Sequence, residues 1–230
     1  MRIGASALVL LICTLFSFTA KSGGILGSSV LISRDGYLIT AEHVIAVCAS
    51  LNAVNIGPVI VVGRDKANDL ALLKLNASIA AEPLPLSMAA VRLGEEVIAV
   101  GYPLEGILGG LNVTNGIVSE VGNTSPRLQF THPQLQFTHP QLQFTAPLQL
   151  GNSGGAVLDR SGALVGILTA RFRARFGFVR GGSAVKREVI QTFLSAQSVR
   201  PVLADNKPER SREEIVELAR KSVFGIECVN

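Results

Sequence analysis

A serine set among glycines is the first candidate for chemistry in this sequence. Gly151-Asn152-Ser153-Gly154-Gly155 stands between two apolar, strand-like segments, residues 142–150 and 156–158. Glycine adopts backbone angles that other residues reach only with strain, and it lets a ligand approach the backbone. Such a turn exposes a serine hydroxyl beside backbone N–H groups, as a nucleophile with an oxyanion hole requires. Taken alone, however, the five residues are more typical of an ordinary hairpin loop.

His43 is the candidate for a general base. The chain has three histidines, and two of them, His132 and His139, lie in copies of one repeat. His43 follows an apolar, strand-like segment, residues 37–40, at the point where the chain turns. We therefore expect its side chain to face a cleft.

Asp69 is the acid best placed to accompany this histidine. It opens the apolar segment 70–75, so we expect it to be partly buried and in need of a partner such as an imidazole N–H. A serine needs a base to take its proton, and the base needs a carboxylate to fix its tautomer. The order His43, Asp69, Ser153 is one of the known orders of such a triad.

Short strands and turns must position these residues. The 230-residue chain is 48% hydrophobic, is rich in glycine and lacks tryptophan, which suits a β-rich protein with one or two domains. Asp35-Gly36 is typical of a hairpin turn. A proline-containing linker near residues 83–92 separates two groups of strands. We expect one β-domain over residues 21–86, a second over residues 87–200 that ends in a helix spanning 184–197, and a charged tail over residues 201–230.

The N-terminus has the pattern of a secretory signal peptide. Met1-Arg2 is followed by an almost wholly apolar segment, and residues 1–20 are the predicted signal. The protein is then secreted or periplasmic, and an uncleaved membrane anchor is the alternative. Cys48 and Cys228 remain after cleavage; they either pair in an oxidising compartment or stay as free thiols.

A perfect tandem repeat precedes the serine. Residues 128–134 and 135–141 are identical, and a partial third copy covers 142–147. Because each copy contains a proline, we expect only the third copy to lie in a native strand and the inserted repeats to protrude. His132 and His139 would face opposite ways on a continuous strand, which disfavours a metal pair. No metal or other cofactor is predicted.

The positive charge of the chain does not indicate a nucleic-acid partner. The net charge is +4, and part of the excess lies in Arg171, Arg173 and Arg175, which alternate with Phe172. This alternation is typical of a strand with one apolar and one solvated face.

Several motifs, taken together in this order, resemble one family. They are Gly27-Ser28-Ser29-Val30-Leu31-Ile32-Ser33, Leu38-Ile39-Thr40-Ala41-Glu42-His43-Val44, Asn68-Asp69-Leu70-Ala71-Leu72-Leu73-Lys74-Leu75, Val97-Ile98-Ala99-Val100-Gly101-Tyr102-Pro103, Val113-Thr114-Asn115-Gly116-Ile117-Val118-Ser119, Gly151-Asn152-Ser153-Gly154-Gly155 and Leu164-Val165-Gly166-Ile167. The chain thus resembles the trypsin-like serine proteases of the bacterial HtrA/Deg type over roughly residues 27–194.

The resemblance implies an all-β fold of two six-stranded antiparallel β-barrels with the active site in the cleft between them. It implies His43 as general base, Asp69 as the acid that orients it, and Ser153 as nucleophile. The implied oxyanion hole is the backbone N–H groups of Gly151 and Ser153, with Asn152 between them.

The implied substrate pocket contains Pro147, Leu168, Thr169 and Ala170. Trypsin-like enzymes that select Lys or Arg place an acid six residues before the nucleophile, where this chain has Pro147. We therefore expect a preference for small or medium aliphatic side chains before the cut.

Three further departures from the family pattern concern the inserted repeats, the PDZ-like domain and the first helix and strand. The repeats lie where the family builds its pocket, and we expect no PDZ-like domain after the second barrel. The family's usual first helix and strand are not found between residue 20 and Gly27, but residues 213–229 resemble them. Ser211-Arg212-Glu213-Glu214 has the pattern of a capping box at the start of this helix. We expect this tail to supply the missing strand; a loosely packed tail is the alternative.

The sequence therefore predicts an exported serine endopeptidase that cleaves proteins or peptides through an acyl-enzyme. The alternatives are a catalytically inactive relative that binds peptides or a partner, and an esterase that uses the same triad.

Overall fold

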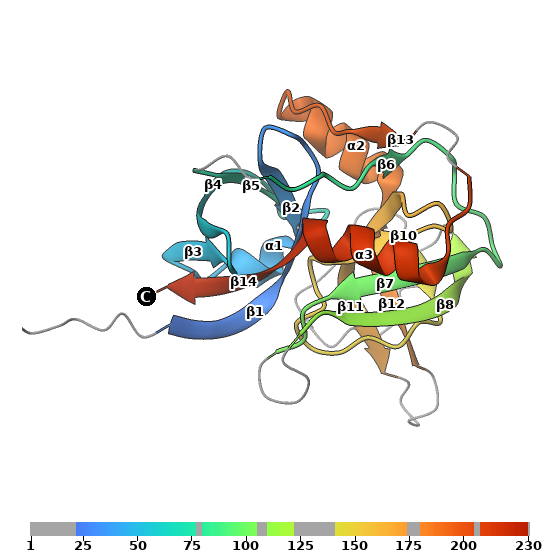
Figure 1. The fold of residues 1–230 in the computed structure, drawn as a ribbon. Coiled ribbons are helices and arrows are strands. Elements are labelled where there is room, and N and C mark those ends of the chain that lie inside the picture. Colours follow the sequence, from blue (N-terminus) through green and yellow to red (C-terminus); the bar gives the residue numbers. More distant parts are fainter. Residues whose placement is uncertain are drawn as a thin grey trace, which may run out of the picture.

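The computed structural model describes residues 22–76, 80–104, 110–121, 141–173, 180–204 and 208–229. The described chain forms two β-barrels that lie side by side, with two longer helices packed on the outside (Figure 1). Three sequence-based predictions fall outside these residues: the signal peptide, the first two repeats up to residue 140 with His132 and His139, and part of the arginine-rich segment.

The first barrel closes from six strands in the order β1-β14-β3-β4-β5-β2. Its strands are β1 (Ser22–Leu31), β2 (Tyr37–Thr40), β3 (Ser50–Ala53), β4 (Gly57–Asp65), β5 (Leu70–Leu75) and β14 (Val223–Val229). The predicted Asp35-Gly36 turn joins β1 to β2, and Gly36 has a φ of +80°, which favours glycine. Leu31, Leu38, Leu73 and Ile226 are among the side chains that fill the barrel.

The second barrel also contains six antiparallel strands. They are β7 (Glu96–Gly101), β8 (Asn112–Val121), β9 (Gln141–Phe144), β10 (Ala156–Leu158), β11 (Leu164–Arg173) and β12 (Arg180–Lys186). The sheet order β10-β7-β8-β9-β12-β11 closes because β10 also pairs with β11. Two short parallel strands, β6 (Leu86–Ser87) and β13 (Leu203–Ala204), extend its edge. The predicted all-β class with two six-stranded barrels is confirmed.

Three helices lie in the described part of the chain: α1 (Glu42–Ile45), α2 (Arg187–Ala196) and α3 (Arg212–Ser222). The predicted capping box of α3 is present, since Ser211 Oγ accepts the Glu214 N–H and the Glu214 carboxylate accepts the Ser211 N–H. The prediction that a helix begins at Ala184 was wrong. Ala184 and Val185 are fully buried and pair with β9 and β11, so tertiary packing overrides the helical spacing there.

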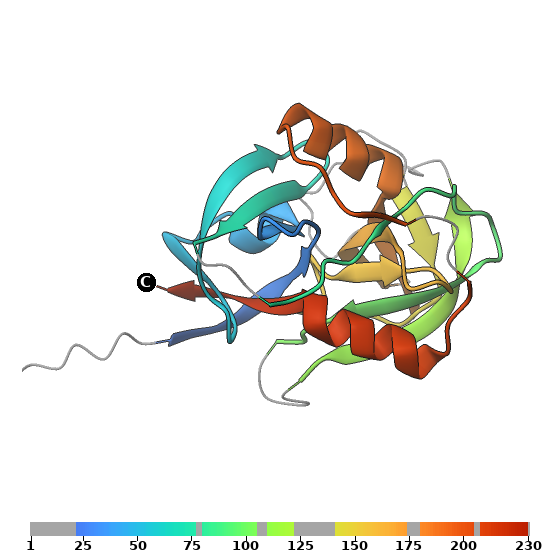
Figure 2. The same ribbon diagram turned by 45° about the horizontal axis from the view of Figure 1, so that its top comes forward.

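The C-terminal segment completes the first barrel. α3 runs along the outside of the second barrel and leads directly into β14 (Figure 2). β14 pairs antiparallel with β1 on one side and with β3 on the other. This is the place that the sequence analysis proposed for the tail strand.

A disulfide joins Cys48 to Cys228, with 5.3 Å between their Cα atoms. Of the two possibilities left open by the sequence, the structure has the paired form. The bond links the end of the α1 region to β14, across 180 positions of sequence.

The third repeat copy supplies a barrel strand. Residues 142–144 of this copy, together with Gln141 from the end of the second copy, form β9 (Gln141–Phe144) between β8 and β12. Asn115 and Gly116 lie within β8, where both residues pair in register with β7. No helix within the described ranges is long and apolar enough to span a membrane.

Candidate functional site

His43 and Asp69 meet at the edge of the first barrel. His43 lies in α1, just after β2, and Asp69 immediately precedes β5. The Asp69 carboxylate contacts the histidine twice, with 2.7 Å between Oδ2 and His43 Nδ1 and 2.9 Å between Oδ1 and the His43 backbone nitrogen. The side chain of Asp69 is 2% exposed and that of His43 is 18% exposed. The buried carboxylate therefore has its partners, as the sequence predicted.

The backbone around Asp69 holds it in this place. Asp69 adopts a left-handed φ of +55°, which asparagine and aspartate tolerate better than most residues. Its carbonyl accepts the backbone N–H of Glu42 at 3.2 Å. The Glu42 carboxylate accepts from Arg64 at 2.8 Å, which ties α1 to β4. Together with the two carboxylate contacts to His43, the bond to Glu42 means that Asp69 joins the loop before β5 to the start of α1 at three points.

The serine turn packs tightly against the first barrel. Gly154 has a φ of +83°, and a Cβ there would lie 2.1 Å from the Ser28 carbonyl oxygen and 2.3 Å from Thr40 Oγ1. Ser28 N–H donates to the Ser153 carbonyl at 2.8 Å. A Cβ on Gly27 would meet both Val44, the neighbour of His43, and the Ser153 carbonyl. The structure therefore brings the serine turn against the segment that carries His43.

Two backbone N–H groups of the serine turn, those of Gly151 and Ser153, are available as donors. Neither Gly151 N–H nor Ser153 N–H donates a hydrogen bond to any residue in the described ranges. The carbonyls of the same two peptide units are both bound: Leu150 O accepts Leu104 N–H at 2.8 Å, and Asn152 O accepts Gly155 N–H at 2.9 Å. In a trans peptide the N–H points away from its carbonyl. These bonds therefore fix the direction of the two free donors.

The side chain of Asn152 binds to the second barrel. It is fully buried, and its Nδ2 donates to Asn112 Oδ1 on β8 at 3.0 Å. Its Oδ1 is a buried oxygen without a partner in the described part of the structure. Asn152 thus anchors the serine turn to the second barrel.

The hydroxyl of Ser153 donates to the backbone carbonyl of Thr169 at 3.0 Å. Thr169 lies in β11, directly after Leu168, whose N–H and carbonyl bond to Gly155 and Gly154. The hydroxyl proton is thus directed at the strand beside the turn.

The four residues predicted for the substrate pocket lie in different surroundings. Leu168 is fully buried in the core of the second barrel, and the Thr169 hydroxyl bonds to Ser183 on β12. Ala170 lies in β11, and its side chain is outside the described residues. Pro147 is exposed, and its carbonyl accepts from Thr114 at 2.9 Å.

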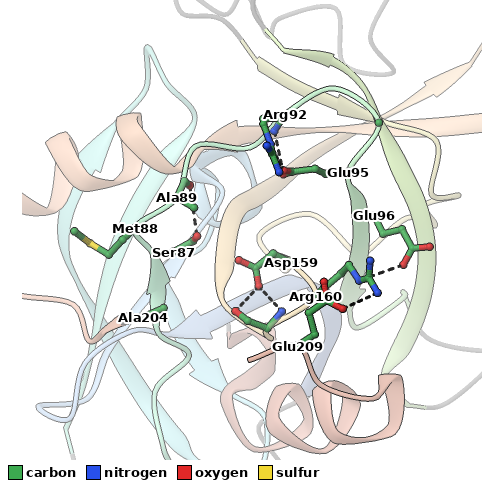
Figure 3. A pocket seen from close by; sticks show the side chains of 12 residues that line it. Ser87, Met88, Ala89, Arg92, Glu95, Glu96, Asp159, Arg160, Ala204 and Glu209 are labelled. Atoms are coloured by element: carbon green, nitrogen blue, oxygen red, sulfur yellow. Dashed lines mark hydrogen bonds and ion pairs between the residues drawn. The ribbon is translucent and has the colours of Figure 1, made fainter. Parts of the chain in front are cut away.

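A separate pocket of about 430 Å³ lies at the outer edge of the second barrel (Figure 3). Arg160 pairs there with Glu209 at 2.7 Å and with Glu96 at 3.9 Å. Burial opposes ionisation of Glu95, but hydrogen bonds and charge from Arg92 outweigh it and lower the pKa of Glu95. The charges around this pocket are therefore largely paired with one another.

A second pocket, of about 650 Å³, lies between α2 and the loop before Asp69. Within the described ranges, no group of three His, Cys, Asp or Glu side chains is arranged to hold a metal ion.

Comparison with known proteins is consistent with this geometry. The family model described as trypsin-like peptidase domain matches residues 27–167. The serine endoprotease DegS of Escherichia coli (strain K12) is 34% identical over 156 residues, which are 64% of this chain and 40% of DegS. The periplasmic pH-dependent serine endoprotease DegQ of the same strain is 32% identical over 179 residues, which are 73% of this chain and 36% of DegQ.

Solved structures of an HtrA-type protease are also similar. The protease AlgW with a decapeptide superposes with a TM-score of 0.63 at 31% identity, covering 75% of this chain and 51% of AlgW. The protein y4bJ of Sinorhizobium fredii (strain NBRC 101917 / NGR234) is 29% identical over 88% of this chain. The chain matches about a third to a half of the length of these relatives.

Proposed function

Because the chain belongs to the trypsin-like peptidase family, we propose that it is an exported serine endopeptidase in which Ser153 is the nucleophile. The observation that carries this proposal is the double contact between Asp69 and His43, on the side of the first barrel against which the serine turn packs. The similarity to DegS, DegQ and AlgW supports a peptide or protein as substrate.

The reaction follows from the hydrogen-bond capacity of each group. Asp69 accepts the Nδ1–H of His43, so Nε2 is the nitrogen that takes the Ser153 hydroxyl proton. Ser153 Oγ then bonds to the substrate carbonyl carbon, and the carbonyl electron pair moves onto its oxygen. The Gly151 and Ser153 N–H groups stabilise that oxyanion. His43 passes the proton to the leaving amine, and an activated water molecule later hydrolyses the acyl-enzyme.

The Ser153 hydroxyl changes its partner during this cycle. In the structure it donates to the Thr169 carbonyl, and in the reaction it donates to His43. We propose that a rotation about the Cα–Cβ bond of Ser153 makes this exchange. We propose that the substrate pocket beside Ser153 takes small or medium aliphatic side chains, because Pro147 stands where enzymes that bind Lys or Arg have an acid.

The disulfide and the N-terminal sequence support export. Disulfides persist in oxidising compartments such as the periplasm, and Cys48 and Cys228 are paired. The positively charged start and the apolar segment after it have the pattern of a secretory signal. The similarity to a periplasmic endoprotease points the same way.

A fluorophosphonate probe tests the proposed nucleophile. The probe phosphonylates an activated serine, and we expect labelling of the wild type but not of Ser153→Ala. The matched control is Ser119→Ala, which removes an exposed serine on β8 and should label as the wild type does. Absence of labelling in the wild type, with hydrolysis of neither casein nor a small ester, would show that the protein is an inactive relative.

A further inference from the structure

Ser28 lies at the contact between the two barrels, directly beneath the serine turn. It belongs to β1 of the first barrel and is fully buried. Its hydroxyl donates to the carbonyl of Gly151 at 2.9 Å and accepts the backbone N–H of Tyr102 at 2.7 Å. Its own backbone N–H donates to the Ser153 carbonyl. One residue of the first barrel therefore binds the carbonyls on both sides of Asn152.

The Gly151 carbonyl has a particular place in the proposed oxyanion hole. Its peptide unit, between Gly151 and Asn152, connects the unit that carries the Gly151 N–H to the unit that carries the Ser153 N–H. Rotation of the connecting unit would change the angle between the two donors. Gly151 has no Cβ and a φ of +93°, so its own backbone offers little resistance to such a rotation. The restraint comes from the partners of this unit: the Asn152 N–H donates to the Gln149 carbonyl at 3.2 Å, and Ser28 Oγ donates to the Gly151 carbonyl at 2.9 Å. Of these two partners, Ser28 is the one that belongs to the first barrel.

The Ser28 hydroxyl also binds the segment from Tyr102 to Leu104, which packs against the serine turn. Tyr102 N–H binds Ser28 Oγ, and Leu104 N–H, two residues later, binds the Leu150 carbonyl. A Cβ on Gly151 would lie 2.3 Å from Leu104 N and 2.5 Å from the Tyr102 carbonyl oxygen, so the two backbones are in direct contact. Ser28 therefore couples the peptide unit between Gly151 and Asn152, and the Tyr102 segment that packs against the turn, to the first barrel.

We propose that Ser28 is a positioning residue, which fixes the angle between the Gly151 and Ser153 N–H groups from the opposite barrel. This inference rests on the proposed function. Ser28 does not touch the reacting atoms; its effect is exerted through the Gly151 carbonyl. Loss of the hydroxyl should therefore reduce kcat, because the developing oxyanion is less well stabilised, and leave KM nearly unchanged.

The chain offers a matched control in the next residue. Ser29 is also fully buried in β1, but its hydroxyl is directed to the Phe224 carbonyl of β14, inside the first barrel. Ser28→Ala and Ser29→Ala remove the same atom from adjacent positions of one strand. We expect kcat to fall by about tenfold or more in Ser28→Ala and to stay within about twofold in Ser29→Ala, both measured well below their Tm.

Hydrogen–deuterium exchange gives a readout that does not depend on activity. Amide exchange over residues 150–156 should be faster in Ser28→Ala than in the wild type and unchanged in Ser29→Ala. Equal exchange and equal kcat in the two variants would overturn the inference. If the wild type does not react with the fluorophosphonate, the proposed function fails, and faster exchange in Ser28→Ala would still support the restraint on the turn.

Discussion

Asp69 holds His43 by its ring and by its backbone at once, because the two oxygens of one carboxylate contact Nδ1 and the main-chain nitrogen. The backbone contact fixes where the residue lies, and the ring contact fixes which nitrogen carries the proton. Replacing the carboxylate by an amide separates these two effects.

Asp69→Asn should keep the position of His43 but reverse its tautomer. The amide oxygen still accepts the backbone N–H, whereas the amide NH₂ faces Nδ1 and forces the proton onto Nε2. Nε2 then carries a proton and has no lone pair with which to take the proton of Ser153. We therefore expect kcat to fall by about 10³- to 10⁴-fold with little change in KM. Steady-state kinetics on a peptide substrate checks this. Asp35→Asn, at the exposed turn between β1 and β2, is the control and should stay near wild-type activity.

Gly154→Ala should lower the free energy of unfolding by much more than the positive φ of Gly154 alone would cause. Gly94 has the same φ of +83°, but a Cβ there meets nothing within 4 Å, whereas a Cβ at Gly154 would overlap Ser28 O and Thr40 Oγ1. We expect Gly94→Ala to cost about 1–2 kcal/mol in the free energy of unfolding, from backbone strain alone. Gly154→Ala should lose more than this in urea unfolding. Equal losses in the two variants would contradict the tight packing of the turn.

The disulfide should make a large contribution to stability. Replacing Cys48 and Cys228 together by serine should lower the free energy of unfolding by about 2–5 kcal/mol, measured in urea. A reducing agent should lower the stability of the wild type by a similar amount and leave the double variant unchanged. If a reducing agent leaves the urea unfolding of the wild type unchanged, the result would argue against the disulfide.

Deletion of residues 212–230 should abolish cooperative unfolding of the first barrel. β14 pairs with both β1 and β3, so its removal opens the barrel and exposes side chains such as Leu31 and Leu51. A synthetic peptide of residues 211–229, added to the truncated protein, should restore the melting transition. The same peptide with Ile226→Asp is the control, because it places a charge at a fully buried position. A truncated protein with an unchanged Tm would contradict this role of the strand.

Much of this arrangement was predictable from the sequence because its signals are local. Alternating apolar strands, the Asp35-Gly36 turn and the capping box at Ser211 depend on neighbours in the chain, and all are present. The triad candidates were found because few residues of the right types stand in suitable contexts. The helix boundary near Ala184 was misplaced, since the burial of Ala184 and Val185 in a sheet depends on partners far away in the chain.

The sequence did not indicate the role of Ser28. A serine in a strand of small residues has no local feature that distinguishes it from Ser29, and both are fully buried. The difference arises from a hydrogen bond to Gly151, 123 positions away. For the same reason the pairing of Cys48 with Cys228 stayed open until the backbone placed their Cα atoms together.

The position of β14 also affects when the proposed protease becomes active. His43 and Asp69 are translated early, but the barrel that holds them needs a strand made of residues 223–229. We therefore expect a nascent or partly translocated chain to carry no closed first barrel, even when Ser153 has already emerged. Ribosome-bound chains halted before residue 223 should not react with a fluorophosphonate. Proteolysis would then be delayed until residues 223–229 have been synthesised and have paired with β1 and β3.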